Sequence, residues 1–379
     1  MAEPVGKCYF QRDFQIMRLG FYNFYKQYNR NRMFEDPSSP IGDNLMYPFV
    51  HLGHKLRALG HEVTTLDLGD LSRFEAVVFL DHPTFLNPYF RRLQQLPGVR
   101  RYLFLLENPA NRPDNYWPAN HRAFERVFTW NPQLVDERKY HRFYLPNQIP
   151  AVTDLPGGAA RKFCVSIASQ KYSNHPDELY SERVRAIRFF ERQHPAEFDL
   201  YGTLWDRWYF RGRLARLNLF LQKLYAGPLR SWHTRRFPSW RGPVPGKHAV
   251  LRQYRFAICY ENAVFPGYIT EKLFDCLFAG CVPVYRGAPE VVDVVPAGTF
   301  IDQRNFRNYD ELYQYLKTMP VSEYENYRTA ITAYLAGPTI QKFGPDAFTQ
   351  LILDHIVSPA RRGKLPGGKK IVPSAAPWA

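Results

Sequence analysis

The residues best suited to chemistry in this 379-residue chain lie in the segment 254–285. A short apolar run ends in Glu261 and Asn262, and after a glycine-containing loop a helical pattern begins with Glu271 and Lys272. Open α/β sheets bind ligands where strands end and helices begin, and the free N–H groups of a helix N-terminus suit a phosphate. A carboxylate followed by an ammonium group can take a ribose hydroxyl pair and a diphosphate oxygen together. These residue types predict a nucleotide-sugar site.

The same segment resembles the donor-binding motif of the glycosyltransferase family 10 fucosyltransferases. The family's Phe-Glu-Asn strand end resembles residues 260–262, its Tyr-[Ile/Val]-Thr-Glu-Lys resembles residues 268–272, and its Val-Pro-Val strand resembles residues 282–284. The spacing of six residues from Asn262 to Tyr268 is also similar to that of the family. The resemblance implies an α/β protein of GT-B architecture, with two Rossmann-like doubly wound domains and the active site in the cleft between them.

An inverting sugar transfer needs a base for the acceptor hydroxyl and positive charge for the departing diphosphate. Glu107 ends an apolar strand pattern, and residues 106–109 resemble the family's Glu-Asn pair before a proline-containing loop. The resemblance implies that Glu107 is the general base. The alternative is a strand-end glutamate that only bonds backbone amides in a turn. Asp81 and His82, which follow a neighbouring strand pattern, are the second choice for a base or an acceptor contact, and Asn108 is a further acceptor candidate.

Arginine suits the diphosphate because its guanidinium group can make two parallel hydrogen bonds to phosphate. The family places an arginine early in a helix, about fourteen residues before a strand-ending aspartate, and Arg185 and Asp199 have that spacing. Arg183 is the fallback, and the alternative is that these arginines only cover a solvated helix face. The resemblance also implies that Lys247 and Lys272 bind the donor.

Four further side chains complete the predicted donor site. The resemblance implies that Glu271 bonds the ribose, that Glu261 and Asn262 line the sugar or nucleotide end, and that Tyr268 stacks on or bonds the base. For Glu261, a buried role in anchoring the loop is a serious alternative, because buried polar groups often serve structure.

Nothing in the sequence indicates a metal site. No Asp-x-Asp motif occurs, and the eleven histidines show no ligand spacing near carboxylates. We therefore expect GDP-fucose as the donor substrate, no required cofactor and no required metal, with basic residues taking the place of a metal on the diphosphate.

Composition limits the class of protein. The chain is 45% hydrophobic, and no run of 18 apolar residues occurs, so we expect a globular protein without a transmembrane helix. The N-terminus lacks the pattern of a signal peptide, and the five scattered cysteines suggest buried thiols in a reducing compartment. Golgi members of the family it resembles carry a membrane anchor and disulfides, so the departure from them implies a bacterial-type cytoplasmic enzyme. The basic segment described next would place it at the inner face of a membrane.

The formal net charge of +15 is concentrated in residues 207–247, which hold ten Lys or Arg, no Asp or Glu, and several aromatic residues. Basic residues among aromatics are typical of anionic membrane contact and of nucleic-acid binding. We favour peripheral contact with an anionic membrane or glycolipid over a solvated basic insertion, and nucleic acid is the least favoured partner. A non-enzymatic binder of anionic surfaces, built around this segment, stays open as an alternative to an enzyme.

Strand patterns alternate with helix patterns along most of the chain, which favours parallel sheets with both faces covered. The turn-rich residues 152–160 are typical of a linker. We therefore predict an acceptor-binding domain in residues 1–150, a donor-binding domain in residues 151–358 and a disordered basic tail in residues 359–379.

Together these features predict an inverting fucosyltransferase. The reaction would move L-fucose from GDP-fucose to a hydroxyl of a glycan acceptor that contains N-acetylglucosamine or glucose, in α-1,3 or α-1,4 linkage. Another GDP-deoxyhexose as the donor is the alternative that keeps the same fold and the same nucleotide residues.

Overall fold

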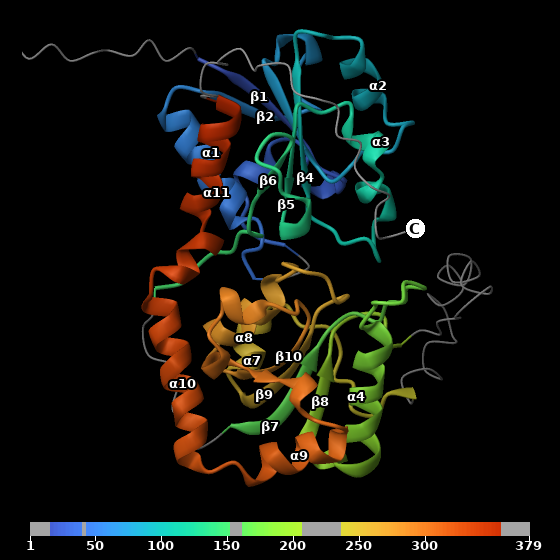
Figure 1. Ribbon diagram of the computed structural model, residues 1–379, viewed down its shortest axis with the longest axis vertical. Coiled ribbons are helices and arrows are strands. Elements are labelled where there is room, and N and C mark those ends of the chain that lie inside the picture. Colours follow the sequence, from blue (N-terminus) through green and yellow to red (C-terminus); the bar gives the residue numbers. More distant parts are fainter. Residues whose placement is uncertain (1–15, 40–42, 152–160, 207–235, 358–379) are drawn as a thin grey trace, which may run out of the picture.

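The computed structural model describes residues 16–39, 43–151, 161–206 and 236–357. The chain forms two lobes stacked along the long axis of the molecule, with the blue-to-green N-terminal half in one lobe and most of the C-terminal half in the other (Figure 1). Each lobe contains one parallel sheet with its own buried core. The predicted α/β class with two Rossmann-like domains is therefore confirmed.

The N-terminal domain is built on a six-stranded sheet in the order β2-β1-β3-β4-β5-β6. All of its pairings are parallel. Its strands are β1 (Arg18–Tyr22), β2 (Glu62–Thr65), β3 (Ala76–Leu80), β4 (Arg100–Leu105), β5 (Arg126–Thr129) and β6 (Tyr140–Arg142). Its helices are α1 (Tyr47–Ala58), α2 (Pro88–Gln94) and α3 (Pro118–His121).

The C-terminal domain is built on a five-stranded parallel sheet in the order β11-β10-β9-β7-β8. Its strands are β7 (Lys162–Ile167), β8 (Phe198–Tyr201), β9 (Tyr254–Tyr260), β10 (Val282–Arg286) and β11 (Ile301–Asp302). Among its described residues the helices are α4 (Tyr180–Gln193), α7 (Lys247–Leu251), α8 (Glu271–Phe278), α9 (Tyr309–Thr318) and α10 (Val321–Ala336).

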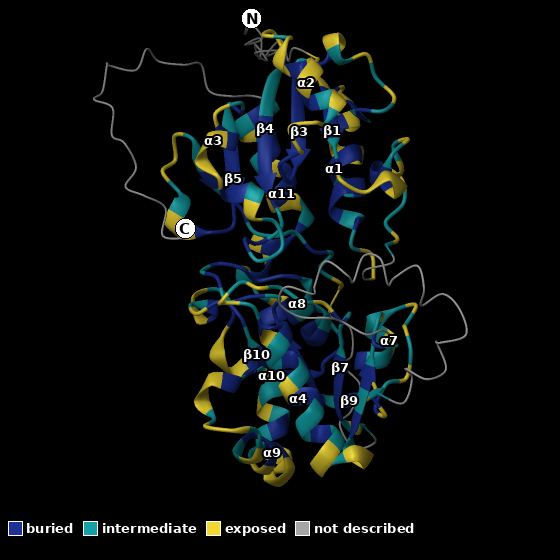
Figure 2. Ribbon diagram, turned by 90° about the vertical axis from the view of Figure 1, so that its right-hand side faces the viewer, coloured by how far each residue is buried: buried dark blue, intermediate teal, exposed yellow. Residues whose placement is uncertain are grey.

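Burial on both faces explains the near-continuous apolar strands. Every residue of β3 is buried, and in β9 only Arg255 is partly exposed. Parallel strands covered by helices on both sides have no polar face, so they do not alternate. Figure 2 shows the same result as dark blue strands inside helices that carry their exposed residues outward.

The strand order places a topological switch point in each domain. In the first sheet β1 lies between β2 and β3, and in the second β7 lies between β8 and β9. The chain leaves such a central strand in one direction and later returns on its other side, so a crevice opens at the carboxyl ends of the strands. The two crevices contribute to the same cleft, because loops after β1, β3 and β4 line it from one side and loops after β7, β8 and β9 from the other.

The chain crosses back to the N-terminal domain near its end. Helix α11 (Pro345–Ile352), followed by a π-helical turn (Leu353–Val357), packs on α1. The ring of Phe348 lies 5.4 Å from that of Phe49 and 5.6 Å from that of Phe104, and Ile356 is buried in the same core. Figure 1 shows α10 and α11 along one side of both lobes. The predicted donor domain of residues 151–358 thus includes a helix, α11, that packs on the N-terminal domain. The sequence does not show this, because an apolar helix face does not reveal which domain will cover it.

Several predictions about the bulk of the chain can be placed. Cys164, Cys259, Cys276 and Cys281 are buried and free, as predicted, while Cys8 lies outside the described residues. The predicted linker, the predicted basic tail and most of the basic segment 207–247 also lie outside them. No helix within the described ranges is long and apolar enough to cross a membrane.

The packing of α11 predicts a large stability effect from a single side chain. Phe348 is 4% exposed at the junction of α11 with α1, and Phe348→Ala should lower the free energy of unfolding by about 3–5 kcal/mol. Urea denaturation measures the change. The control Leu59→Ala, at a site that is 55% exposed just after α1, should cost less than about 0.5 kcal/mol. A loss at Phe348 no larger than that of the control would contradict the docking of α11.

Candidate functional site

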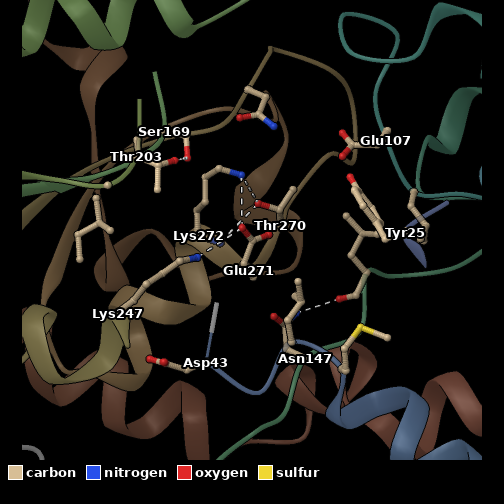
Figure 3. A pocket seen from close by; sticks show the side chains of 18 of the residues that line it. Tyr25, Asp43, Glu107, Asn147, Ser169, Thr203, Lys247, Thr270, Glu271 and Lys272 are labelled. Atoms are coloured by element: carbon tan, nitrogen blue, oxygen red, sulfur yellow. Dashed lines mark hydrogen bonds and ion pairs between the residues drawn. The ribbon is translucent and has the colours of Figure 1, made fainter. Parts of the chain in front are cut away.

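A cleft of about 630 Å³ lies between the two domains. Figure 3 shows its two walls, with side chains from the start of α8 on one side and Glu107 and Tyr25 on the other. Most of the predicted site residues line it: Asp81, Glu107, Arg183, Lys247, Asn262, Tyr268, Glu271 and Lys272. His82, Asn108, Arg185 and Glu261 are the predicted residues that are not part of the lining.

Glu261 holds the start of α8 from beneath the cleft. It is completely buried, and its two carboxylate oxygens accept hydrogen bonds from the backbone N–H and from the hydroxyl of Thr270, both at 2.8 Å. Thr270 is in turn the N-cap of α8. Burial raises the pKa of Glu261, and the nearby ammonium group of Lys272 opposes that rise. The geometry matches the anchoring alternative for Glu261 and not a position on the cleft wall.

A chain of ion pairs connects the charged residues of the donor wall. Nζ of Lys247 lies 2.8 Å from Asp275 and 3.6 Å from Glu271, and Nζ of Lys272 lies 3.6 Å from Glu271 and 3.4 Å from Glu261. Burial alone would raise the pKa of Glu271, but the two ammonium groups outweigh it and lower that pKa to about 2. Glu271 is therefore an anion at neutral pH, ready to accept hydrogen bonds from hydroxyl groups.

Arg183, and not Arg185, reaches the cleft from α4. Successive residues of a helix are rotated by about 100° around its axis. Side chains two residues apart therefore point in nearly opposite directions. Arg183 is 3% exposed and donates to the carbonyl oxygens of Tyr260 at 2.7 Å and Glu261 at 3.2 Å. Arg185 is 73% exposed and pairs with Glu182 at 2.7 Å on the outer face of the helix. The placement corrects the choice between the two arginines in favour of the fallback.

The loop between β9 and α8 reaches into the other domain. Tyr268 is buried with Phe265 in the N-terminal core, and its ring lies 4.8 Å from that of Trp130. Tyr268 therefore joins the two domains at the edge of the cleft. Asn262 lies on the cleft wall, where its carbonyl oxygen accepts a hydrogen bond from the backbone N–H of Leu179 at 2.9 Å.

On the opposite wall, Glu107 follows β4 and is held by its neighbours. Asn111 donates from Nδ2 to Oε2 of Glu107 at 2.8 Å. Oε1 of Glu107 accepts no hydrogen bond from the residues that the structure describes. Asn108 is completely buried, and its Oδ1 accepts from the backbone N–H of Asn111 at 3.2 Å, so it shapes the turn after Glu107. Glu107 thus presents one free carboxylate oxygen at the cleft.

Asp81 supports the backbone of this turn. Its Oδ1 accepts hydrogen bonds from the backbone N–H groups of Leu106 at 2.7 Å and Glu107 at 3.0 Å, and from Nδ2 of Asn115 at 2.6 Å. Burial, with the charge of Glu107, raises the pKa of Asp81 to about 6. Its φ of +64°, unusual for a residue other than glycine, turns the chain sharply after β3. This arrangement fits a supporting role better than that of a free base.

His82 is buried behind the wall. Its two ring nitrogens lack hydrogen-bond partners within the described residues, and it packs among Phe85, Phe90 and Phe124. Burial lowers the pKa of His82 to about 4, so the ring is neutral at physiological pH. The structure does not bring His82 to the cleft.

Sequence reasoning missed several residues of the cleft wall. Ser169 and Thr203 follow β7 and β8, and their hydroxyl oxygens lie 2.7 Å apart across the switch point. Asp43 and Tyr25 come from loops of the N-terminal domain. The rule that ligands bind at the carboxyl ends of strands at a switch point would have found Ser169 and Thr203, whereas no sequence motif marks Asp43 or Tyr25.

Within the described ranges, no three or more His, Cys, Asp or Glu side chains come together in a way that could hold a metal ion. The charged residues of the donor wall are instead paired with one another, as described above for Lys247, Lys272, Glu271 and Asp275.

A family model matches part of the chain. Residues 235–332 match the model of the family described as Glycosyltransferase family 10 (fucosyltransferase) C-term. This segment holds β9, the loop after it, α8 and β10. The resemblance seen in the sequence is confirmed for this part of the chain.

Three curated relatives are similar over short segments. An alpha-(1,3)-fucosyltransferase of Helicobacter pylori is 38% identical over 74 residues, covering 20% of this chain and 16% of the relative. An alpha-(1,4)-fucosyltransferase of Arabidopsis thaliana is 41% identical over 86 residues, 21% of each chain. A GDP-fucose protein O-fucosyltransferase 3 of Gallus gallus is 41% identical over 83 residues, covering 21% of this chain and 18% of the relative. The matches thus span at most about a fifth of the relatives' length.

Solved structures resemble the chain over most of its length. An alpha1,3-fucosyltransferase with GDP-fucose aligns with a TM-score of 0.51 at 15% identity, covering 94% of both chains. An alpha-glucosyltransferase in complex with UDP-glucose and DNA aligns with a TM-score of 0.52 at 11% identity, covering 91% of this chain and all of the other. These likenesses show the fold, and the predicted GT-B architecture is confirmed.

The turn after β8 predicts a strict requirement for glycine. Gly202 has a φ of +120°, and a Cβ at this position would lie 2.0 Å from the carbonyl oxygen of Ala168. Gly202→Ala should therefore lower the free energy of unfolding by about 2 kcal/mol or more. The control Gly98→Ala, at a position with open space around a Cβ, should change it by less than about 0.5 kcal/mol. Equal effects of the two substitutions in chemical denaturation would contradict this turn geometry.

Proposed function

We propose, on the premise that residues 235–332 form a family 10 C-terminal domain, that this protein is an inverting fucosyltransferase. It transfers L-fucose from GDP-fucose to a hydroxyl of a glycan that contains N-acetylglucosamine or glucose, in α-1,3 or α-1,4 linkage. The observation that carries the proposal is the cleft itself, in which Glu107 faces the charged start of α8 (Figure 3). The names of similar curated relatives support fucose as the sugar, and the name of the GDP-fucose protein O-fucosyltransferase 3 supports GDP-fucose as the donor.

The donor wall supplies the contacts that a nucleoside diphosphate needs. The N-terminus of α8 carries the positive end of the helix dipole, and Lys272 lies on its first turn. Arg183 uses one terminal nitrogen on backbone carbonyls, and Nε and Nη1 make no hydrogen bond to the described residues. We assign Lys272 and Arg183 to the diphosphate and the ionised Glu271 to the ribose hydroxyls.

The acceptor wall supplies the base. In the proposed step, Oε1 of Glu107 takes the proton of the acceptor hydroxyl. The oxygen of that hydroxyl forms a bond to the anomeric carbon of fucose at the same time. The bond from that carbon to the diphosphate oxygen breaks, and GDP leaves with the bonding electrons. Attack opposite the leaving group inverts the anomeric configuration. Lys272 and Arg183 stabilise the charge that develops on the diphosphate, and we propose that the reaction needs no divalent metal for this reason.

Tyr25 and Phe24 are aromatic residues that line the cleft on the acceptor side. They are 50% and 46% exposed, although both are large and apolar, and Figure 3 shows Tyr25 beside Glu107. Exposed aromatic rings at a cleft offer a flat surface to the apolar face of a sugar ring. This supports a glycan as the acceptor. Peripheral contact of residues 207–247 with an anionic membrane from the cytoplasmic side stays a prediction.

The role of Glu107 predicts a selective loss of turnover. Glu107→Gln keeps the shape and the hydrogen bond from Asn111 but removes the base, so kcat should fall by about 10²-fold or more. The measurement is GDP release from GDP-fucose with N-acetyllactosamine as the acceptor probe, alongside calorimetric titration with GDP. GDP affinity should not change, because Glu107 lies on the opposite wall. Turnover that survives the substitution would place the base elsewhere.

The two arginines of α4 make a matched pair for testing the donor wall. Arg183→Ala should weaken GDP binding by about tenfold or more, since a charge-assisted hydrogen bond to phosphate is lost. Arg185→Ala removes the same charge from the outer face of the same helix and should change GDP affinity by less than about twofold. Calorimetric titration with GDP measures both. Equal losses of GDP affinity would show that only the overall charge of the helix matters. A loss in Arg185→Ala alone would show that Arg185 is the phosphate ligand.

A further inference from the structure

A chain of hydrogen bonds crosses from one domain to the other and ends on Glu107. Tyr180, on the first turn of α4, donates from its hydroxyl to Oδ1 of Asn111 at 2.6 Å. Asn111, in the turn after β4, donates from Nδ2 to Oε2 of Glu107 at 2.8 Å. The side chain that orients the carboxylate is thus itself oriented from the donor domain.

The direction of this chain is fixed by the chemistry of its ends. An ionised carboxylate only accepts hydrogen bonds, so the NH₂ group of Asn111 must face Glu107. The amide oxygen of Asn111 then faces Tyr180, whose hydroxyl must donate. Burial raises the pKa of Tyr180 to about 12, so its proton is present at physiological pH. The three side chains therefore share one consistent arrangement of donors and acceptors.

The donor-domain end of the chain is tied to the donor wall. The backbone N–H of Leu179, just before Tyr180, donates to the carbonyl oxygen of Asn262 at 2.9 Å. The guanidinium carbon of Arg183 lies 5.5 Å from the centre of the Tyr180 ring. Tyr180 is 3% exposed, so it has little freedom to move by itself. Its hydroxyl therefore keeps a fixed position relative to the residues assigned to the diphosphate.

We infer that Asn111 and Tyr180 are positioning residues for the base. Asn111 binds one oxygen of Glu107 and leaves the other for the acceptor, and Tyr180 holds Asn111, so the orientation of the base depends on contact with the donor domain. This inference rests on the proposed function, because it assigns Asn111 and Tyr180 no chemistry except through Glu107. It extends that function because it makes the correct orientation of Glu107 depend on Tyr180 of the donor domain.

The test combines Tyr180→Phe, Asn111→Ala and the double variant in the GDP-release assay with GDP-fucose and N-acetyllactosamine. Each single substitution should lower kcat by about tenfold, since a misoriented general base loses part of its contribution. The double variant should lose no more than the larger single effect, because both residues act through one chain. The KM for GDP-fucose should change by less than about twofold, because no donor contact is removed.

Ser173→Ala is the matched control. Ser173 makes a neighbouring hydrogen bond between the domains, from Oγ to the carbonyl oxygen of Ala110 at 2.8 Å, without touching Glu107 or the side chain of Asn111. This control should keep kcat within about twofold of the unsubstituted protein, since the half-buried Ser173 hydrogen-bonds a backbone carbonyl and not the side chains that orient Glu107. If Ser173→Ala lowers kcat as much as Tyr180→Phe, the contacts only hold the domains together and the inference is overturned.

Repeating the Tyr180→Phe substitution in the Glu107→Gln variant tests this inference separately from the proposed function. In Glu107→Gln, adding Tyr180→Phe should lower kcat no further, because the residue it acts through is gone. A further loss there would overturn the positioning role. Full turnover by Glu107→Gln, or no turnover by the unsubstituted protein, would contradict the proposed function. A slow Glu107→Gln with unchanged kcat in Tyr180→Phe and Asn111→Ala would contradict the positioning role alone.

Discussion

The donor half of the cleft depends on a cluster of buried and half-buried charges at the start of α8. Lys247 and Lys272 each lie within 4 Å of two carboxylates from the set Glu261, Glu271 and Asp275. Burying a charge costs several kcal/mol unless a partner compensates it, so removing one member leaves another without compensation. The cluster fixes the N-cap Thr270 through Glu261 and keeps Glu271 ionised. The shape and the charge of the donor wall therefore follow from a single set of contacts.

The second half of the cleft is organised by hydrogen bonds and not by ion pairs. Asp81 holds the backbone of Glu107 and Asn111 holds its side chain, both from within the same domain, while Tyr180 holds Asn111 from the donor domain. The two walls thus carry the two kinds of group that a sugar transfer needs. Cations lie where a diphosphate would leave, and a carboxylate lies where a hydroxyl would attack. Because the loop with Tyr268 and helix α11 both pack into the N-terminal core, the domains are joined at more than one place.

Much of this architecture follows from local sequence patterns. The apolar run of β3 and the periodic pattern of α9 are recognisable from sequence, since continuous burial and strong amphipathicity leave little choice of element. Strand β1 carries only a weak strand signal, because its five residues include an exposed arginine and a glycine. The motif around Glu271 and Lys272 was found because its residues are close in sequence and follow the strand-to-helix rule.

What the sequence could not supply is the direction in which a side chain points. Arg183 and Arg185 are two residues apart on one helix, and only the packing of α4 against β9 decides which of them faces the cleft. The destination of α11 is likewise a property of the whole fold. The contacts of Asn111 with Glu107 and Tyr180 join residues that are up to 69 positions apart, so no local pattern contains them.

The most direct test of the central claim, that this cleft binds a GDP-sugar, is calorimetric titration with GDP, UDP and GDP-fucose without added metal. The account predicts that GDP and GDP-fucose bind and that UDP binds much more weakly. No binding of GDP, or a preference for UDP, would contradict it.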